Sequence, residues 1–419
     1  MTLGVPVQRL AFGPFCLEIT TTRLLRDGAP LDLRLQAFHA LRVLLQNAGR
    51  PVDYEQMIRE AWDGVYVSRH TVAVTVGEVK KALRECGSWI TCRPGLGYRL
   101  DVPESDGLIR KGWHFLGHRT RESLDRAVNC FQQAVQADSG DVRAFEGLSR
   151  AYLNLGTNGM RAPQEVYPAF QQAHRQAVAL TGMTPELRTD LGYALHMFER
   201  KLAEAESELL RARREQPSLA ITCVRLTMLY AAMGRLDEAL QYLDEAYRAD
   251  PLLPLLPATE TAIRFIRREY DCAIECGKKA VELHPYVQLA RVFYAQALEY
   301  AGRRDEALAQ YRNACVICPD LPWLRALEAA CLAGCGRARE ATEVLLELQR
   351  IRSAEYVDAY YLAILQEALG NRDAALQEME RAYLEGSATL SIVGVDPKMD
   401  WLRREPRLQP ERELGASPS

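Results

Sequence analysis

The chain has 419 residues, of which 48% are hydrophobic and 26% charged, with 20 Pro and 27 Gly. This composition excludes a disordered or collagen-like chain, and the length predicts either several domains or a small domain followed by a long repeat array. Lys and Arg (52) nearly balance Asp and Glu (55), so any nucleic-acid contact depends on where the basic residues lie rather than on the net charge.

No stretch approaches the ~18 consecutive apolar residues that a membrane span needs, and the N-terminal segment lacks the features of a secretory signal. We therefore expect a cytoplasmic protein that has no membrane segment and whose eleven cysteines are reduced. The cysteines include three local pairs, namely Cys272 with Cys276, Cys315 with Cys318, and Cys331 with Cys335. The last four of these residues raise the alternative of a zinc site. Pairs on helices are not the turn-based arrangement of structural zinc sites, so we expect no metal and no cofactor.

Short strand-like segments open the chain at 10–12, 15–19 and 23–25. With the hairpin signal at Asp27-Gly28, they predict a small antiparallel sheet. Apolar residues at helical spacing then predict a first helix. The apolar face of this helix is expected to consist of Leu35, Phe38, Leu41, Leu44 and Leu45.

Two further helices are predicted by polar residues at their N-cap positions. Asp53 precedes a second helix that runs to Trp62, and Ser68 precedes a third over 69–85. At ~100° per residue the third helix has one apolar stripe, expected to be buried, formed by Val72, Val76, Val79 and Leu83. Its opposite face presents His70, Val74, Gly77 and Lys81. Two short strands around a glycine-rich turn are expected over 89–100.

This order of strands, three helices and a β-hairpin resembles the OmpR/PhoB-type winged helix-turn-helix domain over nearly all of 9–101. The residues that carry the resemblance are Phe12-Gly-Pro-Phe15, Leu33-Arg-Leu-Gln-Ala-Phe38, Asn47-Ala-Gly-Arg50, Trp62 and Pro94-Gly-Leu-Gly-Tyr-Arg99. The resemblance implies that the third helix enters the major groove of double-stranded DNA, the wing touches the adjacent minor groove, and the tryptophan contacts the backbone.

The polar side chains of this domain then divide into two expected groups. Base readout is assigned to His70, Thr71, Thr75 and a contact of Val74 with a thymine methyl. Contact with the DNA backbone is assigned to Trp62, Arg69, Lys80, Lys81, Arg84, Arg93 and Arg99. Two alternatives stay open. Trp62 is equally compatible with packing in the core, and His70 is compatible with being a polar surface residue that contacts no base. Three residues depart from the family pattern and weigh against DNA affinity: Gly77, Glu78 and Leu96.

A 34-residue period dominates the rest of the chain. Prolines recur at 217, 251, 285 and 319, glycines at 234, 302, 336 and 370, and alanines at 205, 239, 273, 307, 341 and 375. A glycine that ends one helix, an alanine at a helix crossing and a proline beyond the next helix are typical of a repeated helical hairpin. The pattern resembles the tetratricopeptide repeat, and about eight hairpins are expected over 108–391.

The predicted fold class is therefore an α+β winged helix-turn-helix domain followed by an all-α tetratricopeptide-repeat solenoid. The expected domains are 1–101 for the winged helix, 102–107 for a linker, 108–391 for the solenoid and 392–419 for a C-terminal cap and tail. In this order the chain resembles HilA-type bacterial transcriptional regulators. A homodimer is compatible with this organisation.

The predicted function is DNA-binding transcription regulation, with a protein or peptide partner bound by the solenoid. The alternative is a repeat scaffold whose winged helix has weak or no DNA affinity. No nucleotide loop, catalytic triad or metalloprotease motif supports an enzyme.

Overall fold

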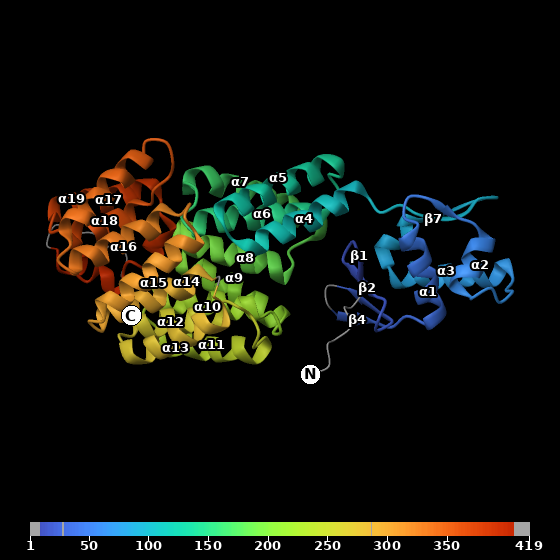
Figure 1. The fold of residues 1–419 in the computed structure, drawn as a ribbon, viewed down its shortest axis with the longest axis horizontal. Helices are drawn as coiled ribbons and strands as arrows, with labels where there is room; N and C mark the ends of the chain where they lie inside the picture. Colours follow the sequence, from blue (N-terminus) through green and yellow to red (C-terminus); the bar gives the residue numbers. More distant parts are fainter. Residues whose placement is uncertain (1–8, 27–28, 286, 406–419) are drawn as a thin grey trace. The chain divides into compact units, whose positions relative to one another are not determined.

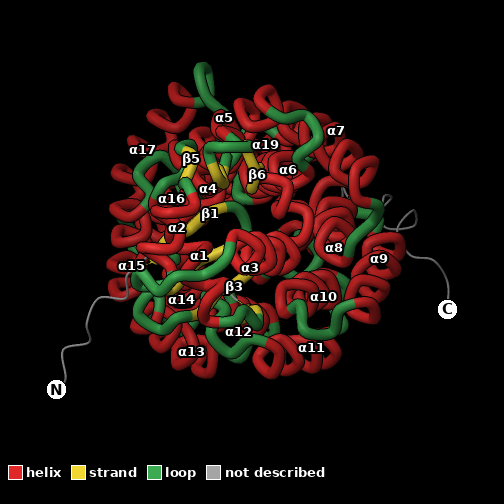
Figure 2. The backbone as a smooth tube through the Cα atoms, turned by 90° about the vertical axis from the view of Figure 1, so that its right-hand side faces the viewer, coloured by secondary structure: helices red, strands yellow, loops and turns green. Residues whose placement is uncertain are grey.

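The computed structural model describes residues 9–26, 29–285 and 287–405 (Figure 1). The chain divides into two compact units. The first consists of the residues up to 114 together with 129–144, and the second of 115–128 together with the residues from 145 onward. Strands occur among the N-terminal elements, and the later elements are helices and loops (Figure 2).

The N-terminal sheet is an antiparallel meander of four strands in chain order. Its strands are β1 (Arg9–Phe12), β2 (Phe15–Glu18), β3 (Arg23–Arg26) and β4 (Ala29–Leu31). Phe12 pairs with Phe15, and Leu17 pairs with Leu24, and all four side chains are buried. The expected sheet is thus confirmed, and the Asp27-Gly28 turn lies outside the described residues.

Three helices and a second sheet complete this region. The helices are α1 (Leu35–Gln46), α2 (Tyr54–Ala61) and α3 (Arg69–Ala82), and the sheet has the order β5 (Pro51–Val52), β7 (Gly97–Leu100), β6 (Ile90–Arg93). Two details differ from expectation. Leu35 is 60% exposed, because the first turn of α1 extends beyond the core. Helix α3 ends at Ala82 rather than at residue 85, and a 3₁₀ segment, η1 (Arg84–Trp89), continues the chain.

From Glu104 onward the described chain is helical, with short 3₁₀ and π segments. The helices are α4 (Glu104–His118), α5 (Arg121–Ala137), α6 (Val142–Thr157), α7 (Pro163–Thr181), α8 (Pro185–Ala194), α9 (Leu202–Glu215), α10 (Ala220–Ala232), α11 (Leu236–Ala249), α12 (Leu256–Ile266), α13 (Tyr270–Leu283), α14 (Gln288–Tyr300), α15 (Arg304–Ile317), α16 (Pro322–Gly334), α17 (Ala338–Ile351), α18 (Ala359–Ala368) and α19 (Arg372–Glu385). In the second unit each of the hairpins α8–α9, α10–α11, α12–α13, α14–α15, α16–α17 and α18–α19 packs as a pair. The solenoid expected from the 34-residue period is confirmed.

The alanines of the period lie where the sequence predicts. Ala205, Ala239, Ala273, Ala307, Ala341 and Ala375 are all fully buried, each in the second helix of a hairpin. A methyl group at these positions allows the two backbones to approach closely. The 34-residue spacing therefore repeats one helix-packing contact six times.

The turns inside the hairpins share a left-handed backbone. Gly234, Gly302, Gly336 and Gly370 have φ between 75° and 82°. Arginine occupies the corresponding turn in three other hairpins, where Arg119, Arg200 and Arg268 have φ of 55°, 54° and 65°. A side chain in this conformation is strained, so these three turns retain arginine at a conformational cost.

The segment expected to be a linker is partly helical, since α4 begins at Glu104. Within the first unit Asp106 is fully buried and accepts a hydrogen bond of 2.9 Å from the Gly13 amide. The same carboxylate lies 3.1 Å from the Arg110 guanidinium and 2.9 Å from that of Arg143. A buried carboxylate is favourable only with such partners, so Asp106 ties the start of α4 to the rest of this unit.

The described chain ends in three 3₁₀ segments, η3 (Ala388–Ile392), η4 (Pro397–Met399) and η5 (Leu402–Arg404). Lys398 Nζ lies 2.7 Å from Glu299 Oε2 on α14, and Tyr360 on α18 donates a hydrogen bond of 2.8 Å to Asp396. These contacts hold the end of the described chain against the helices of the second unit.

Candidate nucleic-acid interface

Helix α3 is oriented by its buried stripe. The Ser68 hydroxyl accepts a hydrogen bond of 3.2 Å from the Thr71 amide and so caps the first turn. Val72, Val76, Val79 and Leu83 are at most 1% exposed, which confirms the predicted stripe. Because these residues face the core, the opposite side of α3 is open to solvent.

The open side carries most of the polar residues selected from the sequence. Arg69, His70, Thr71, Lys81 and Arg84 are exposed and Lys80 is half-buried. Val74 is 47% exposed among them. Thr75 differs, because it is 6% exposed and its hydroxyl donates a hydrogen bond of 2.9 Å to the Thr71 carbonyl. The structure thus leaves these cations accessible along α3 and just after it, and it turns Thr75 toward the core.

Aromatic contacts join the first turn of α3 to the wing sheet. The Arg69 guanidinium lies over the Tyr54 ring at 5.0 Å, and the Tyr54 ring meets the Tyr98 ring edge-on at 5.8 Å. Burial and a hydrogen bond with Tyr54 raise the pKa of Tyr98 to about 12, so its hydroxyl stays protonated. This stack connects α3, α2 and β7, and it restricts where the Arg69 charge can lie.

The wing is the hairpin of β6 and β7, which pair from Ile90 with Leu100 to Arg93 with Gly97. Gly97 has φ of 94°, and an added Cβ would meet the Val52 carbonyl oxygen at 2.0 Å, so this position requires glycine. Arg93 is exposed beside the tip, and Leu96 at the tip is 54% exposed. An apolar side chain and a cation therefore share the tip.

Arg99 and Trp62, two further selected residues, also have contacts within the protein. The Arg99 Nε lies 2.7 Å from Asp101 Oδ2, so much of its charge is compensated. Trp62 follows α2 and packs, half-buried, against the hydrophobic core of this region. Its position is compatible with a core role and leaves part of the ring accessible.

Sequence reasoning missed the partner of Glu78. The Arg34 guanidinium forms a salt bridge with the Glu78 carboxylate, and its Nε donates a hydrogen bond of 3.0 Å to Glu78 Oε2. The two residues lie on different elements, so no local spacing indicates the pair. The negative charge that weighed against DNA affinity is thus largely balanced by a neighbouring cation.

The cysteine pairs lie in packed surroundings. All eleven cysteines are free thiols, and burial raises the pKa of Cys315 and Cys331 to about 12. No group of three or more His, Cys, Asp or Glu side chains suited to a metal occurs in residues 9–26, 29–285 and 287–405. Across the same residues, none of the helices is long and apolar enough to span a bilayer.

Comparison with known proteins gives two separate likenesses. Residues 28–100 match the family described as "Transcriptional regulatory protein, C terminal". This chain is 33% identical over 85 residues to the transcriptional regulatory protein CutR from Streptomyces coelicolor. The CutR protein from Streptomyces lividans gives the same values. These residues are 20% of this chain and 39% of CutR, so the chain spans well under half the length of CutR.

The second likeness is to solved helical structures. The human IFIT1 dimer with m7Gppp-AAAA aligns with a TM-score of 0.54 and 17% identity, over 84% of this chain and 90% of that chain. A monomeric IFIT1 mutant with Gppp-AAAA gives a TM-score of 0.54 at 16% identity, over 84% and 91%. At this identity the likeness concerns the fold alone.

Because residues 28–100 match the regulator family, the N-terminal region belongs to the OmpR/PhoB-type transcriptional regulator domains. It is followed in the chain by a tetratricopeptide-like helical array.

Proposed function

We propose that this protein is a cytoplasmic, DNA-binding transcription regulator in which α3 enters the major groove and the wing contacts the flanking backbone. The observation that carries the proposal is the solvent side of α3, where Arg69, His70 and Lys81 are exposed, together with the exposed Arg84 just after the helix. Cations placed along one helix face can reach phosphates on both sides of a groove. The proposal assigns DNA binding to 1–101 and no chemical reaction to any part of the chain.

The residues divide by the contact that each can make. His70, Thr71 and Val74 lie on the open side of the first turns of α3 and are proposed to meet base edges. Phosphate contacts are proposed for Arg69, Lys80, Lys81, Arg84 and Arg93, with a smaller share for Trp62 and Arg99. Thr75 is proposed to act indirectly, because its hydroxyl is already bonded to the Thr71 carbonyl.

The solenoid is proposed to bind a protein or peptide partner that sets the activity of the regulator. Support comes from the architecture, since stacked helical hairpins form an extended surface to which successive repeats contribute. The first helices of the hairpins α10–α11, α12–α13 and α14–α15 contribute to one lined cavity, which indicates that these helices share an inner face.

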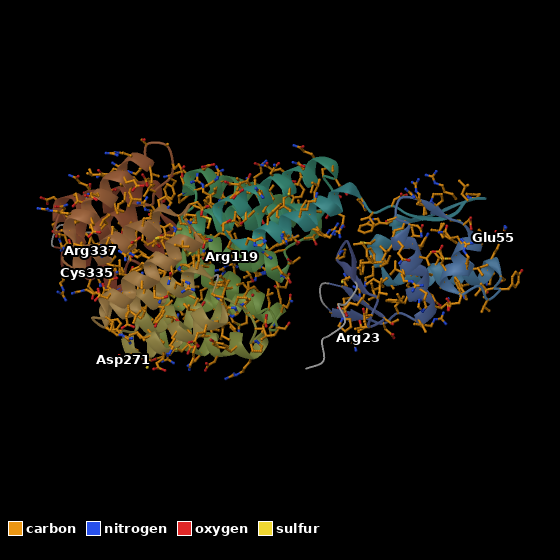
Figure 3. The ribbon with its side chains drawn as sticks, in the orientation of Figure 1. Arg23, Glu55, Arg119, Asp271, Cys335 and Arg337 are labelled. Carbon is orange, nitrogen blue, oxygen red and sulfur yellow. The ribbon has the colours of Figure 1, made fainter. Side chains whose placement is uncertain are left out.

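The proposed DNA binding is tested by removing one positive charge at a time, at Lys81 on α3 or at Arg84 just after it. Lys81→Ala and Arg84→Ala in the full chain should each weaken binding to a genomic duplex, and by similar factors for different sequences, because phosphate contacts carry no base information. Fluorescence anisotropy with a labelled duplex measures the affinity. Arg23→Ala, an exposed arginine on β3 (Figure 3), is the matched control and should change little. Wild-type affinity in both the Lys81 and the Arg84 variant would instead favour the scaffold alternative.

A further inference from the structure

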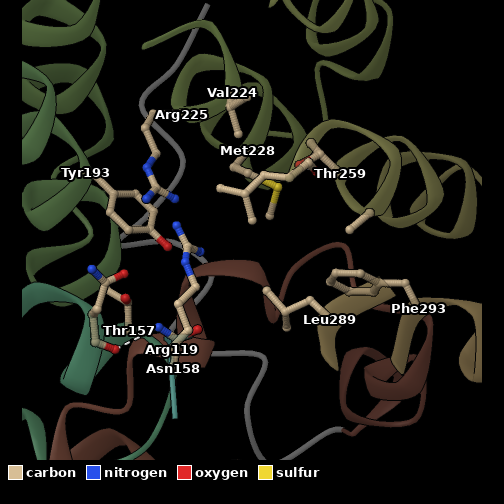
Figure 4. A pocket seen from close by; sticks show the side chains of 13 residues that line it. Arg119, Thr157, Asn158, Tyr193, Val224, Arg225, Met228, Thr259, Leu289 and Phe293 are labelled. Carbon is tan, nitrogen blue, oxygen red and sulfur yellow. Dashed lines mark hydrogen bonds between the residues drawn. The ribbon is translucent and has the colours of Figure 1, made fainter. Parts of the chain in front are cut away.

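A cavity of about 80 Å³ lies within the second unit, lined by helices α6, α8, α10, α12 and α14 and by the turn after α4 (Figure 4). Its walls differ in chemistry. Arg119, Arg225 and Tyr193 gather on one side, and Leu289 and Phe293 lie across from them (Figure 4). A cavity with convergent polar groups and an apolar wall is the usual form of a small-molecule site.

The positive charges of Arg119 and Arg225 repel each other across the cavity wall. The Arg225 guanidinium lies 3.5 Å from the centroid of the Tyr193 ring, which fixes it at the cavity wall. Burial and the nearby positive charge of Arg225 lower the pKa of Arg119. Two like charges in a half-buried site repel each other more strongly than they would in water.

Neither arginine has a carboxylate partner among the described residues of the chain. The contrast with other arginines of the second unit is clear, because Arg188 lies 2.6 Å from Glu208 and Arg352 2.6 Å from Glu378. The carboxylate of Asp190 is already engaged, 3.0 Å from Arg150. The cavity therefore keeps an uncompensated positive charge.

The buried histidine near Arg225 does not supply a counter-charge. His196 is fully buried, and burial together with the Arg225 charge lowers its pKa to about 4. It is neutral near pH 7, and neither ring nitrogen has a hydrogen-bond partner among the described residues. No group that lines or adjoins the cavity thus offsets the two guanidinium charges.

The repeat pattern marks Arg225 as an exception. Arg225, Thr259 and Phe293 occupy the same position of the 34-residue period in α10, α12 and α14, and the flanking repeats have Leu191 and Leu327 there. A neutral side chain therefore suffices to build a repeat at this position. Arg119 holds a left-handed turn, as Arg200 and Arg268 do in other hairpins, and of these three arginines it is the one that lines the cavity. Strained residues that point into a cavity are a feature of binding sites.

We propose that this cavity binds a small organic acid whose carboxylate or phosphate lies between Arg119 and Arg225 and whose apolar part lies along Leu289 and Phe293. Guanidinium groups bind both oxyanions through paired hydrogen bonds. The volume suits an acidic head group of a few atoms rather than a folded polymer. The inference goes beyond the proposed function, and its test does not require that the chain binds DNA.

The test is calorimetric titration of the full chain at constant ionic strength with four probes: inorganic phosphate, hexyl phosphate, hexanoate and hexanol. At least one anionic probe should bind and the neutral hexanol should not. Binding of hexanoate alone identifies a carboxylate site, and binding of the two phosphates alone identifies a phosphate site. Hexyl phosphate should bind more tightly than inorganic phosphate if the apolar wall contributes.

Arg225→Gln should weaken binding of the anionic probe about tenfold or more, because a charge-assisted contact is lost. Arg248→Gln removes an equal charge from an exposed site on α11 and should leave the affinity unchanged. Without probe, Arg225→Gln should melt at or above the wild-type temperature, since removal of one guanidinium relieves the repulsion. Arg119→Gln should behave in the same way.

Three results would overturn the proposal. The first is failure of every anionic probe to bind the wild-type chain. The second is equal binding by Arg225→Gln and Arg248→Gln. The third is loss of folding in both Arg225→Gln and Arg119→Gln, which would show that the arginines serve the packing of the repeats.

Discussion

At the scale of single residues, charge pairing decides which side chains of α3, η1 and the wing remain available to a ligand. Arg99 has a carboxylate partner in Asp101, and Glu78 is balanced by Arg34. Lys81 and Arg84 lie on the solvent side and are exposed. The candidate interface is therefore smaller and more specific than a count of basic residues suggests.

The Arg34–Glu78 pair leads to a prediction about affinity. Glu78→Gln should strengthen duplex binding about two- to fivefold, because it removes a carboxylate from the helix proposed to enter the groove and releases Arg34. Stability should fall by less than about 1 kcal/mol, since the Arg34 side chain is 74% exposed. Anisotropy and thermal melting measure the two effects. The control is Glu55→Gln, which removes one exposed acid from α2 (Figure 3). An affinity gain of the same size in both variants would contradict the prediction that the release of Arg34 from Glu78 strengthens binding.

At the scale of elements, local patterns predicted what depends on neighbours in the chain. The buried stripe of α3 follows from helical periodicity and the buried alanines follow from the 34-residue period, and both predictions are confirmed for the residues that they name. Leu35 was predicted in the apolar face of α1 and is exposed, because periodicity does not reveal where a helix leaves the core. The pairs Arg34 with Glu78 and Arg119 with Arg225 could not be predicted, because tertiary packing alone brings them together. The sequence does mark Arg225, because it places a charged residue at a repeat position where the flanking repeats have a neutral one.

The close packing of helices within a repeat is tested by two matched alanine variants on α15. Ala307 is fully buried and Ala309 is exposed. Ala307→Leu should lower the free energy of unfolding by about 1–3 kcal/mol through overpacking, whereas Ala309→Leu should change it little. Thermal melting distinguishes them. Similar melting temperatures for the two variants would mean that the assigned helix contact is wrong.

The left-handed arginine turns give a second test at this scale. Arg200 is exposed with φ of 54°, so Arg200→Gly should relieve strain of about 1 kcal/mol, partly offset by the greater freedom of glycine in the unfolded chain. Gly302→Ala, with φ of 82° and open space around the added Cβ, should lose about 1 kcal/mol. Chemical denaturation measures both. A loss of stability in Arg200→Gly would indicate that the arginine side chain supports the turn.

At the scale of the whole molecule, we propose that the N-terminal region binds DNA and that the helical array binds the partner that sets its activity. The division is proposed at 102–107, although Asp106 contacts both Gly13 and Arg143 within the first unit. Fragments intended to isolate DNA binding should therefore retain the start of α4. The match to the regulator family covers residues 28–100.

The proposed contacts of the chain with the phosphates of duplex DNA can be tested through the salt dependence of binding. The measurement uses the full chain. The logarithm of the association constant should fall linearly with the logarithm of salt concentration, with a slope of about −3 to −5 for the proposed contacts of Arg69, Lys80, Lys81, Arg84 and Arg93. The slope should flatten by about 1 in Lys81→Ala. An affinity that is independent of salt, or no measurable binding at low salt, would show that the chain does not contact the phosphates of duplex DNA.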